Sequence, residues 1–148
     1  MRGRGQRGNG IIEFSLMAPW LIFLFIGALD WGFYAYSLIA TEAAARVGAL
    51  YASTSSTTAT DSTTVCTYAL QQLLKMPNVG SSVTTCASGS SVTSSQPVGV
   101  SATAVTGPDS NNAAQVSVTY QTPIFMPLLG TLPKQLTITR TIVMRLRS

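Results

Sequence analysis

The sequence predicts an α+β protein: a long N-terminal transmembrane helix followed by a small C-terminal domain, in which one short helix packs on an antiparallel sheet of about three to four strands. Three observations support this prediction. Residues 14–40 form an almost uncharged apolar run. Ser and Thr then account for 33 of the 98 residues from Tyr51 to Ser148. Within that second part, apolar residues recur first at helical spacing and later with period two.

The composition restricts the classes of function. Charged residues make up 9% of the chain and histidine is absent, whereas soluble proteins contain about 25% charged residues. Acid–base catalysis draws mainly on histidine and on carboxylates, and here no base stands ready to activate a Ser or Thr nucleophile. We therefore expect no enzyme, no catalytic residue, no cofactor and no small-molecule substrate.

Residues 1–8 form a basic leader that contains Arg2, Arg4 and Arg7. The segment 9–51 is predicted to be one helix, because its apolar run exceeds the roughly 20 residues that cross a bilayer. Asp30 is the only charged residue within 14–40, and apolar residues cover every helical face, as in a helix surrounded by lipid. The alternative is the core helix of a soluble protein, but the rest of the chain is too polar to enclose one. Pro19 is expected to kink or loosen the helix.

The positive charges predict the orientation of this helix. Three arginines precede the apolar run 14–40, and only Arg46 lies shortly after that run, so the N-terminus is expected in the cytoplasm and the C-terminal domain outside. A cleaved secretory signal is the alternative, but the apolar run is too long and no suitable small-x-small site follows closely. The arginine–glycine leader could also contact nucleic acid; a topology anchor explains it better, and we expect no nucleic-acid partner.

The outer part is predicted to contain a Ser/Thr linker or loose loop at 52–62 and an extracytoplasmic α+β domain at 63–148. A short helix should run from Ser62 or Thr63 to Met76, capped by Asp61 or Ser62 and terminated by Pro77 and Asn78. Three alternating stretches then read as strands, around 98–104, 116–120 and 136–146. Arg140 falls in the apolar register of the last strand, as a register break or a strand-edge charge. The apolar, proline-containing loop 123–133 could cover the core, lie on the membrane or dock on another subunit.

Cys66 and Cys86 are the two cysteines of the chain. The predicted orientation places both outside the cytoplasm, where disulfides persist. An even pair in such a compartment most simply forms one disulfide, which would strengthen a small domain with a thin core. Without histidine or further cysteines, a metal site is not expected.

Glu13 is the most informative residue, because a carboxylate at the edge of a hydrocarbon layer is costly. The simplest explanation places it among lipid headgroups. Its spacing suggests another: Gly8 precedes Asn9, and Glu13 is the fifth residue counted from Asn9. This is the type IV prepilin processing pattern. Cleavage after Gly8 would create an amine at Asn9 that could pair with Glu13 of a neighbouring helix, which would spare both charges most of the cost of burial.

Residues 8–50 resemble the TadE-like proteins of tight-adherence (Tad/Flp) pilus systems. The resemblance is carried by Gly8, the Glu13–Phe14 pair, Pro19, Asp30 and the segment 43–46. It implies a minor pilin or pseudopilin, cleaved after Gly8 by a prepilin peptidase, with Glu13 setting the register of helix assembly. It also implies a single-pass protein of the bacterial inner membrane whose partners are the membrane, other pilins and minor pilins, the peptidase and the pilus assembly platform. Members often carry a basic residue soon after the acidic one, whereas here Trp31 follows Asp30. An uncleaved single-span envelope protein that scaffolds the pilus or secretion machine is the alternative.

Overall fold

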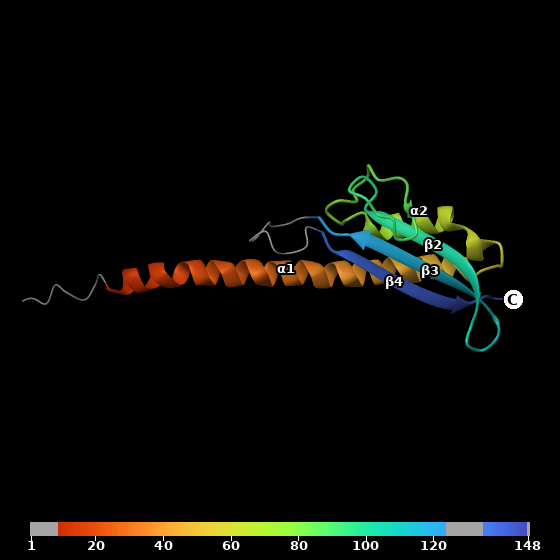
Figure 1. Cartoon of the computed structure of the whole chain (residues 1–148), viewed down its shortest axis with the longest axis horizontal. Helices are drawn as coiled ribbons and strands as arrows, with labels where there is room; N and C mark the ends of the chain where they lie inside the picture. The colour runs from red at the N-terminus through yellow and green to blue at the C-terminus, as the bar shows by residue number, and fades with distance from the viewer. Residues whose placement is uncertain (1–8, 124–134, 148) are drawn as a thin grey trace, which may run out of the picture. The chain divides into compact units, whose positions relative to one another are not determined.

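The computed structural model describes residues 9–123 and 135–147, and it confirms an α+β fold. The chain divides into two compact units, Met1–Ala35 and Tyr36–Ser148. Their elements, in chain order, are α1 (Asn9–Ala52), the 3-10 helix η1 (Thr58–Thr60), α2 (Ser62–Leu73), β1 (Ala87–Ser88), β2 (Val98–Thr106), β3 (Asn112–Gln121) and β4 (Thr137–Arg145) (Figure 1).

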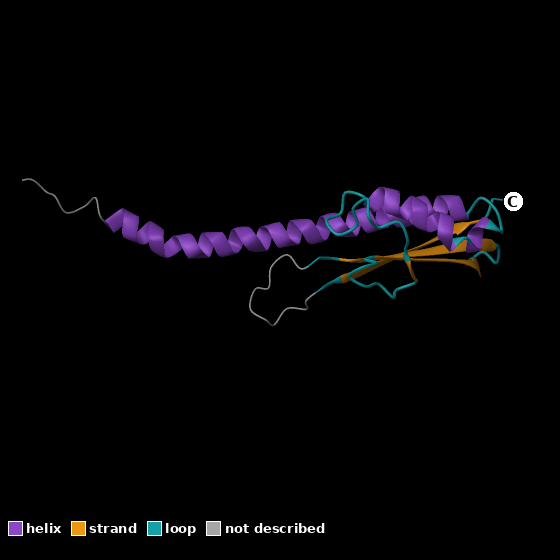
Figure 2. Cartoon of the chain, turned by 90° about the horizontal axis from the view of Figure 1, so that it is seen from above, coloured by secondary structure: helices purple, strands orange, loops and turns teal. Residues whose placement is uncertain are grey.

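The first unit contains the N-terminal part of α1. Its large apolar side chains are exposed all round the helix: Leu16 is 77% exposed, Trp20 71% and Leu24 63%. The helix is long and apolar enough to cross a membrane, as the sequence predicts. It runs through Pro19 without interruption, and its ribbon bends near the N-terminal end (Figure 2). The described part of the first unit, residues 9–35, is therefore a helical segment with an apolar surface.

Within the second unit, the remainder of α1 becomes a packed helix. A row of small side chains on one face is fully buried, comprising Ser37, Thr41, Ala44, Ala45, Ala49 and Ala52. Gly48 lies in the same row, and a Cβ built on it would stand 2.8 Å from Val65 of α2 and 3.3 Å from Val116 of β3. Small residues let the three backbones approach closely, so this half of α1 forms part of the domain core.

The sheet has the order β1-β2-β3-β4. Strands β2 and β3, and β3 and β4, are antiparallel as predicted. The predicted antiparallel arrangement is confirmed for these three strands, and the additional strand β1, which pairs with β2 in parallel, makes the sheet mixed. This strand has two residues, too few to show any alternation in the sequence. The following loop packs tightly on β2: a Cβ on Gly99 would overlap the carbonyl oxygen of Gly89.

One face of the sheet forms the core. The register sets Val98 opposite Tyr120, Val100 opposite Val118 and Ala102 opposite Val116, and all six side chains are buried. The opposite face is rich in hydroxyl groups, with Ser117 bonded to Thr141 at 2.7 Å and Thr119 to Thr139 at 3.0 Å between side-chain oxygens. The alternation in the sequence therefore corresponds to a sheet with one apolar, buried face and one face that carries Ser and Thr hydroxyl groups.

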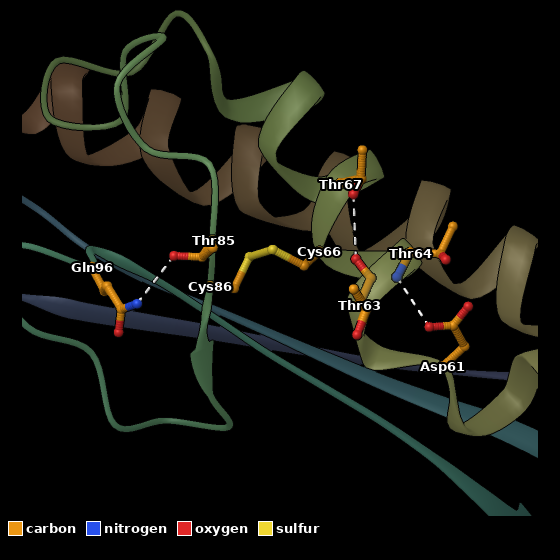
Figure 3. The surroundings of a disulfide bond; sticks show 8 residues. All are labelled: Asp61, Thr63, Thr64, Cys66, Thr67, Thr85, Cys86 and Gln96. Atoms are coloured by element: carbon orange, nitrogen blue, oxygen red, sulfur yellow. Dashed lines mark hydrogen bonds between the residues drawn. A yellow bond between two sulfur atoms is a disulfide. The ribbon is translucent and has the colours of Figure 1, made fainter.

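Helix α2 covers the core face beside β2. Asp61 caps it by accepting a hydrogen bond from the Thr64 backbone N–H at 3.1 Å (Figure 3). The pKa of Asp61 is lowered, first by its hydrogen bonds with Thr64 and also by the bond from the Tyr51 hydroxyl. The regular helix ends at Leu73, and Met76, predicted to end it, lies buried in the turn that follows.

The predicted Ser/Thr linker, 52–62, contains ordered turns in the structure. The Ser53 N–H donates to the Ala49 carbonyl at 2.9 Å, extending the end of α1. The Thr58 hydroxyl donates to the Ser55 carbonyl at 2.9 Å, and Ala59 is fully buried. Hydroxyl side chains therefore form hydrogen bonds with the backbone of this compact connection. The four predicted domain boundaries stay predictions.

Candidate membrane and assembly site

Glu13 lies near the beginning of α1, among apolar side chains. It is exposed, as are its neighbours Ile12 and Phe14, at 68% each, and Leu16. Within the described residues, the ion pairs are Glu42–Arg46 and Asp109–Arg145, so Glu13 belongs to neither. A carboxylate in such a setting is expensive to place in lipid unless water or a positive group reaches it.

Asn9 and Glu13 lie one helical turn apart. Asn9 is the first residue of α1, and residues four apart in a helix share a face. Gly8, the predicted residue before the cut, lies outside the described residues. Cleavage at Gly8 would therefore leave Asn9 as the N-terminus, with Glu13 one helical turn further along α1.

Asp30 is the next acidic residue along α1 after Glu13, and it too is exposed. The seventeen residue steps from Glu13 to Asp30 correspond to roughly 26 Å along a helix, close to the roughly 30 Å of a hydrocarbon core. Trp31 and Tyr34 follow with an edge-to-face ring contact, 6.3 Å between centroids. Two carboxylates thus bracket the apolar surface, and an aromatic pair lies beside the second, as at a membrane interface.

The cysteines Cys66 and Cys86 are joined by a disulfide in the structure, across 20 residues of sequence. The bond ties α2 to the segment that leads into β1 (Figure 3). No group of three or more acidic, cysteine or histidine side chains that could hold a metal ion occurs in the described ranges 9–123 and 135–147.

A second tie, which the sequence did not reveal, joins the turn after α2 to β3. The buried Tyr120 hydroxyl donates to Asn78 Oδ1 at 2.6 Å, and Asn78 Nδ2 donates to the Gln121 carbonyl at 2.7 Å. Burial raises the pKa of the Tyr120 phenol. The position of Asn78 after Pro77 indicated a turn but gave no sign of a partner 42 residues away.

Of the two alternatives for Arg140, the structure favours a charge on an edge strand over a register break. The register of β4 is unbroken, and Arg140 lies opposite Val118 between Ile138 and Ile142 in the apolar register. Its side chain is exposed. Of the predicted apolar loop 123–133, residues 124–133 lie outside the described part of the chain.

Together these features define a class: a protein with one N-terminal helix able to cross a membrane and a small, disulfide-containing α+β domain. Residues 8–50 match the family model described as TadE-like protein, which confirms the resemblance inferred from the sequence. The match covers the segment with Gly8, Glu13, Pro19 and Asp30, and it indicates a protein associated with a Tad pilus. Comparison of the chain with curated proteins and with solved structures gave no match.

Proposed function

We propose that the chain is a minor pilin or pseudopilin, a structural subunit needed to assemble a Tad-type adhesive pilus, and not an enzyme. The observation that carries the proposal is Glu13: an exposed carboxylate among apolar side chains near the beginning of α1, one turn from Asn9. Its position within the segment that matches the TadE-like model supports the same reading.

The proposed mechanism rests on pairing two charges. A prepilin peptidase cuts after Gly8, and the new amine of Asn9 meets the Glu13 carboxylate of a neighbouring helix during assembly. Either charge alone is costly in an apolar bundle, whereas a well-placed pair recovers much of the cost of leaving water. Pairing therefore favours one axial register of the helices over its alternatives.

The proposed location is the bacterial inner membrane, with the N-terminus in the cytoplasm and the outer domain on the far side. Assembly then incorporates the subunit into the pilus. The leader arginines favour this orientation, and the Cys66–Cys86 disulfide fits an oxidising compartment. The proposed partners are other pilins and minor pilins, the prepilin peptidase and the pilus assembly platform.

A second candidate is an uncleaved single-span envelope protein that scaffolds the pilus or secretion machine. The observation that favours it is the spacing of Glu13 and Asp30, which would place both carboxylates at the two surfaces of a bilayer. In that case Glu13 would need no amine as a partner, and its charge would do no more than mark the membrane boundary.

The test is a Glu13→Gln variant, with Asp30→Asn as its matched control. Removing one partner of a buried pair costs about 3–5 kcal/mol, so we expect Glu13→Gln to reduce recovery of the subunit in sheared pili by more than about tenfold. Cleavage of the leader should be unaffected, and Asp30→Asn should assemble normally. Normal assembly of Glu13→Gln would show that the carboxylate sets no register and would favour the anchor.

A further inference from the structure

The two edges of the sheet differ. One edge is β1, which has two residues and is followed by the loop that packs on Gly99. The other is β4, a nine-residue strand that, among the described strands, pairs only with β3 (Figure 1). A long open edge presents a row of backbone donors and acceptors that another extended chain can use.

The hydrogen bonds at the two ends of β4 show which groups face outward. The Thr122 N–H donates to the Leu136 carbonyl at 2.8 Å, and the Leu146 N–H donates to the Asn112 carbonyl at 3.0 Å. Even-numbered residues of β4 therefore bond to β3, and alternation in an antiparallel ladder directs the odd-numbered ones to the open edge. These five are Thr137, Thr139, Thr141, Val143 and Arg145. In the described ranges, no backbone partner is assigned to their outward groups.

The open edge closes at its far end. The next odd-numbered residue is Arg147, whose N–H donates to the Ser53 carbonyl at 2.9 Å. The chain after α1 therefore already occupies the position that an added strand would otherwise take. This bond limits an added strand to the stretch beside residues 137–145.

Arg140 decides which strand fits. It lies on the core face of β4 between Ile138 and Ile142, is exposed, and belongs to neither ion pair of the described residues. Because Arg140 lies between two outward-facing residues, it would occupy the closer, non-hydrogen-bonded position of a new antiparallel pair, where opposite side chains interact most. The side chain opposite Arg140 would therefore meet a guanidinium flanked by isoleucines.

A second copy of β4 meets this requirement poorly. Strand β4 has the sequence TITRTIVMR, which contains two arginines and no carboxylate. Antiparallel pairing of two copies centred on Thr141 would place the two Arg140 side chains on a diagonal of the new ladder, where like charges repel. An inward-pointing charge on an edge strand is a known obstacle to such self-association.

We propose that the open edge of β4 binds an extended acidic segment of another polypeptide. The segment adds a strand beside residues 137–145 and brings an Asp or Glu opposite Arg140. Apolar side chains lie two residues away on either side, one of them against the half-buried Ile142. Backbone hydrogen bonds supply the affinity and the carboxylate supplies the choice of partner. This proposal does not rest on cleavage at Gly8 or on the role of Glu13.

The experiment uses the full chain in detergent micelles and the peptide Thr-Val-Thr-Glu-Thr-Val-Thr. We expect it to bind about threefold or more tightly than the same peptide with Lys in place of Glu, consistent with the strength of opposite-charge cross-strand pairs. Shifts in amide NMR signals should concentrate at Thr139, Thr141 and Val143. N-methylation of the two Thr amides beside Glu should abolish binding.

Two variants sharpen the test. Arg140→Glu should reverse the preference, so that the Lys peptide binds more tightly. Val143→Pro removes one outward N–H while keeping the bonds to β3, so it should fold and lose binding, whereas the control Val143→Thr should retain binding. Equal affinity for both peptides, or no binding to the parent chain, would overturn the proposal. A dimer of the chain that Val143→Pro abolishes would identify a second copy as the occupant and would overturn it as well.

Discussion

Gly48 of α1 and Val65 of α2 are in such close contact that a Cβ on Gly48 would stand 2.8 Å from Val65 Cγ1. Val65 is fully buried, and Val116 of β3 closes the third side at 3.3 Å. One position therefore holds the end of α1, α2 and the sheet together. This contact makes the second half of α1 a part of the domain instead of a simple connection to it.

Replacing Gly48 with Ala should destabilise the outer domain. The added methyl group has no room between two buried valines, and overpacking of this kind costs about 1–3 kcal/mol. For a domain of this size, that loss lowers the midpoint of thermal unfolding by about 5 °C or more. Gly32→Ala is the matched control, because nothing lies within 4 Å of a Cβ there. Near-ultraviolet circular dichroism of the full chain in detergent measures the unfolding midpoints of the two variants. Equal midpoints for Gly48→Ala and Gly32→Ala would contradict the close packing at Gly48.

Removing the Tyr120 hydroxyl should weaken the tie between β3 and the turn after α2. Tyr120→Phe loses the 2.6 Å bond to Asn78 and leaves a polar atom without that donor, at a cost of about 1–2 kcal/mol. Tyr68→Phe is the control, since Tyr68 is 37% exposed. Denaturant titration measures the free energy of unfolding for both, and a loss no larger than that of the control would show that the bond contributes nothing.

The same tyrosine predicts a dependence on alkaline pH. Burial raises the pKa of Tyr120 above its ordinary value of 10.0, so the folded state favours the neutral phenol. Its contribution to stability is complete below pH 10.0 and decreases as the pH rises above that value. The unfolding midpoint of the parent should therefore fall more steeply above pH 10.0 than that of Tyr120→Phe; parallel slopes would contradict the assignment.

Reduction of the Cys66–Cys86 disulfide should destabilise the domain. The bond closes a loop with a sequence separation of 20, which corresponds to about 3 kcal/mol in the chain-entropy account. A reductant should lower the free energy of unfolding of the parent by that amount. The double variant Cys66→Ser, Cys86→Ser should have the same free energy of unfolding as the reduced parent, and reductant should not change it. If reductant leaves the free energy of unfolding of the parent unchanged, the disulfide does not stabilise the domain.

Long, regular patterns made much of the fold predictable. The apolar run yielded α1 almost to its observed end at Ala52. The alternation of Val116, Val118 and Tyr120 assigned the core face of β3 correctly. Residues 107–112 have the sequence GPDSNN, which is typical of a turn, and β2 and β3 pair across it as an antiparallel hairpin. Each of these features repeats over several residues, so local pattern and tertiary packing agree.

Contacts between distant small or polar residues could not be predicted in this way. Ser37, Thr41 and Gly48 lie in a buried face of α1 that carries no large apolar side chains, so no hydrophobic period marks it. The two-residue β1 is too short for any pattern. For the candidate site, spacing and family resemblance indicated Glu13, but the open edge beside Arg140 depends on strand order, which the sequence leaves open.

The mass of the mature N-terminus tests the central claim most directly. The full chain, produced together with its prepilin peptidase, should lose residues 1–8 and begin at Asn9, and a Gly8→Leu variant should keep them. Intact-mass spectrometry with N-terminal peptide sequencing distinguishes the two forms. A mature chain that begins at Asn9 is the result that the pilin account predicts; a chain that keeps its leader beside an active peptidase would contradict that account and leave the single-span anchor.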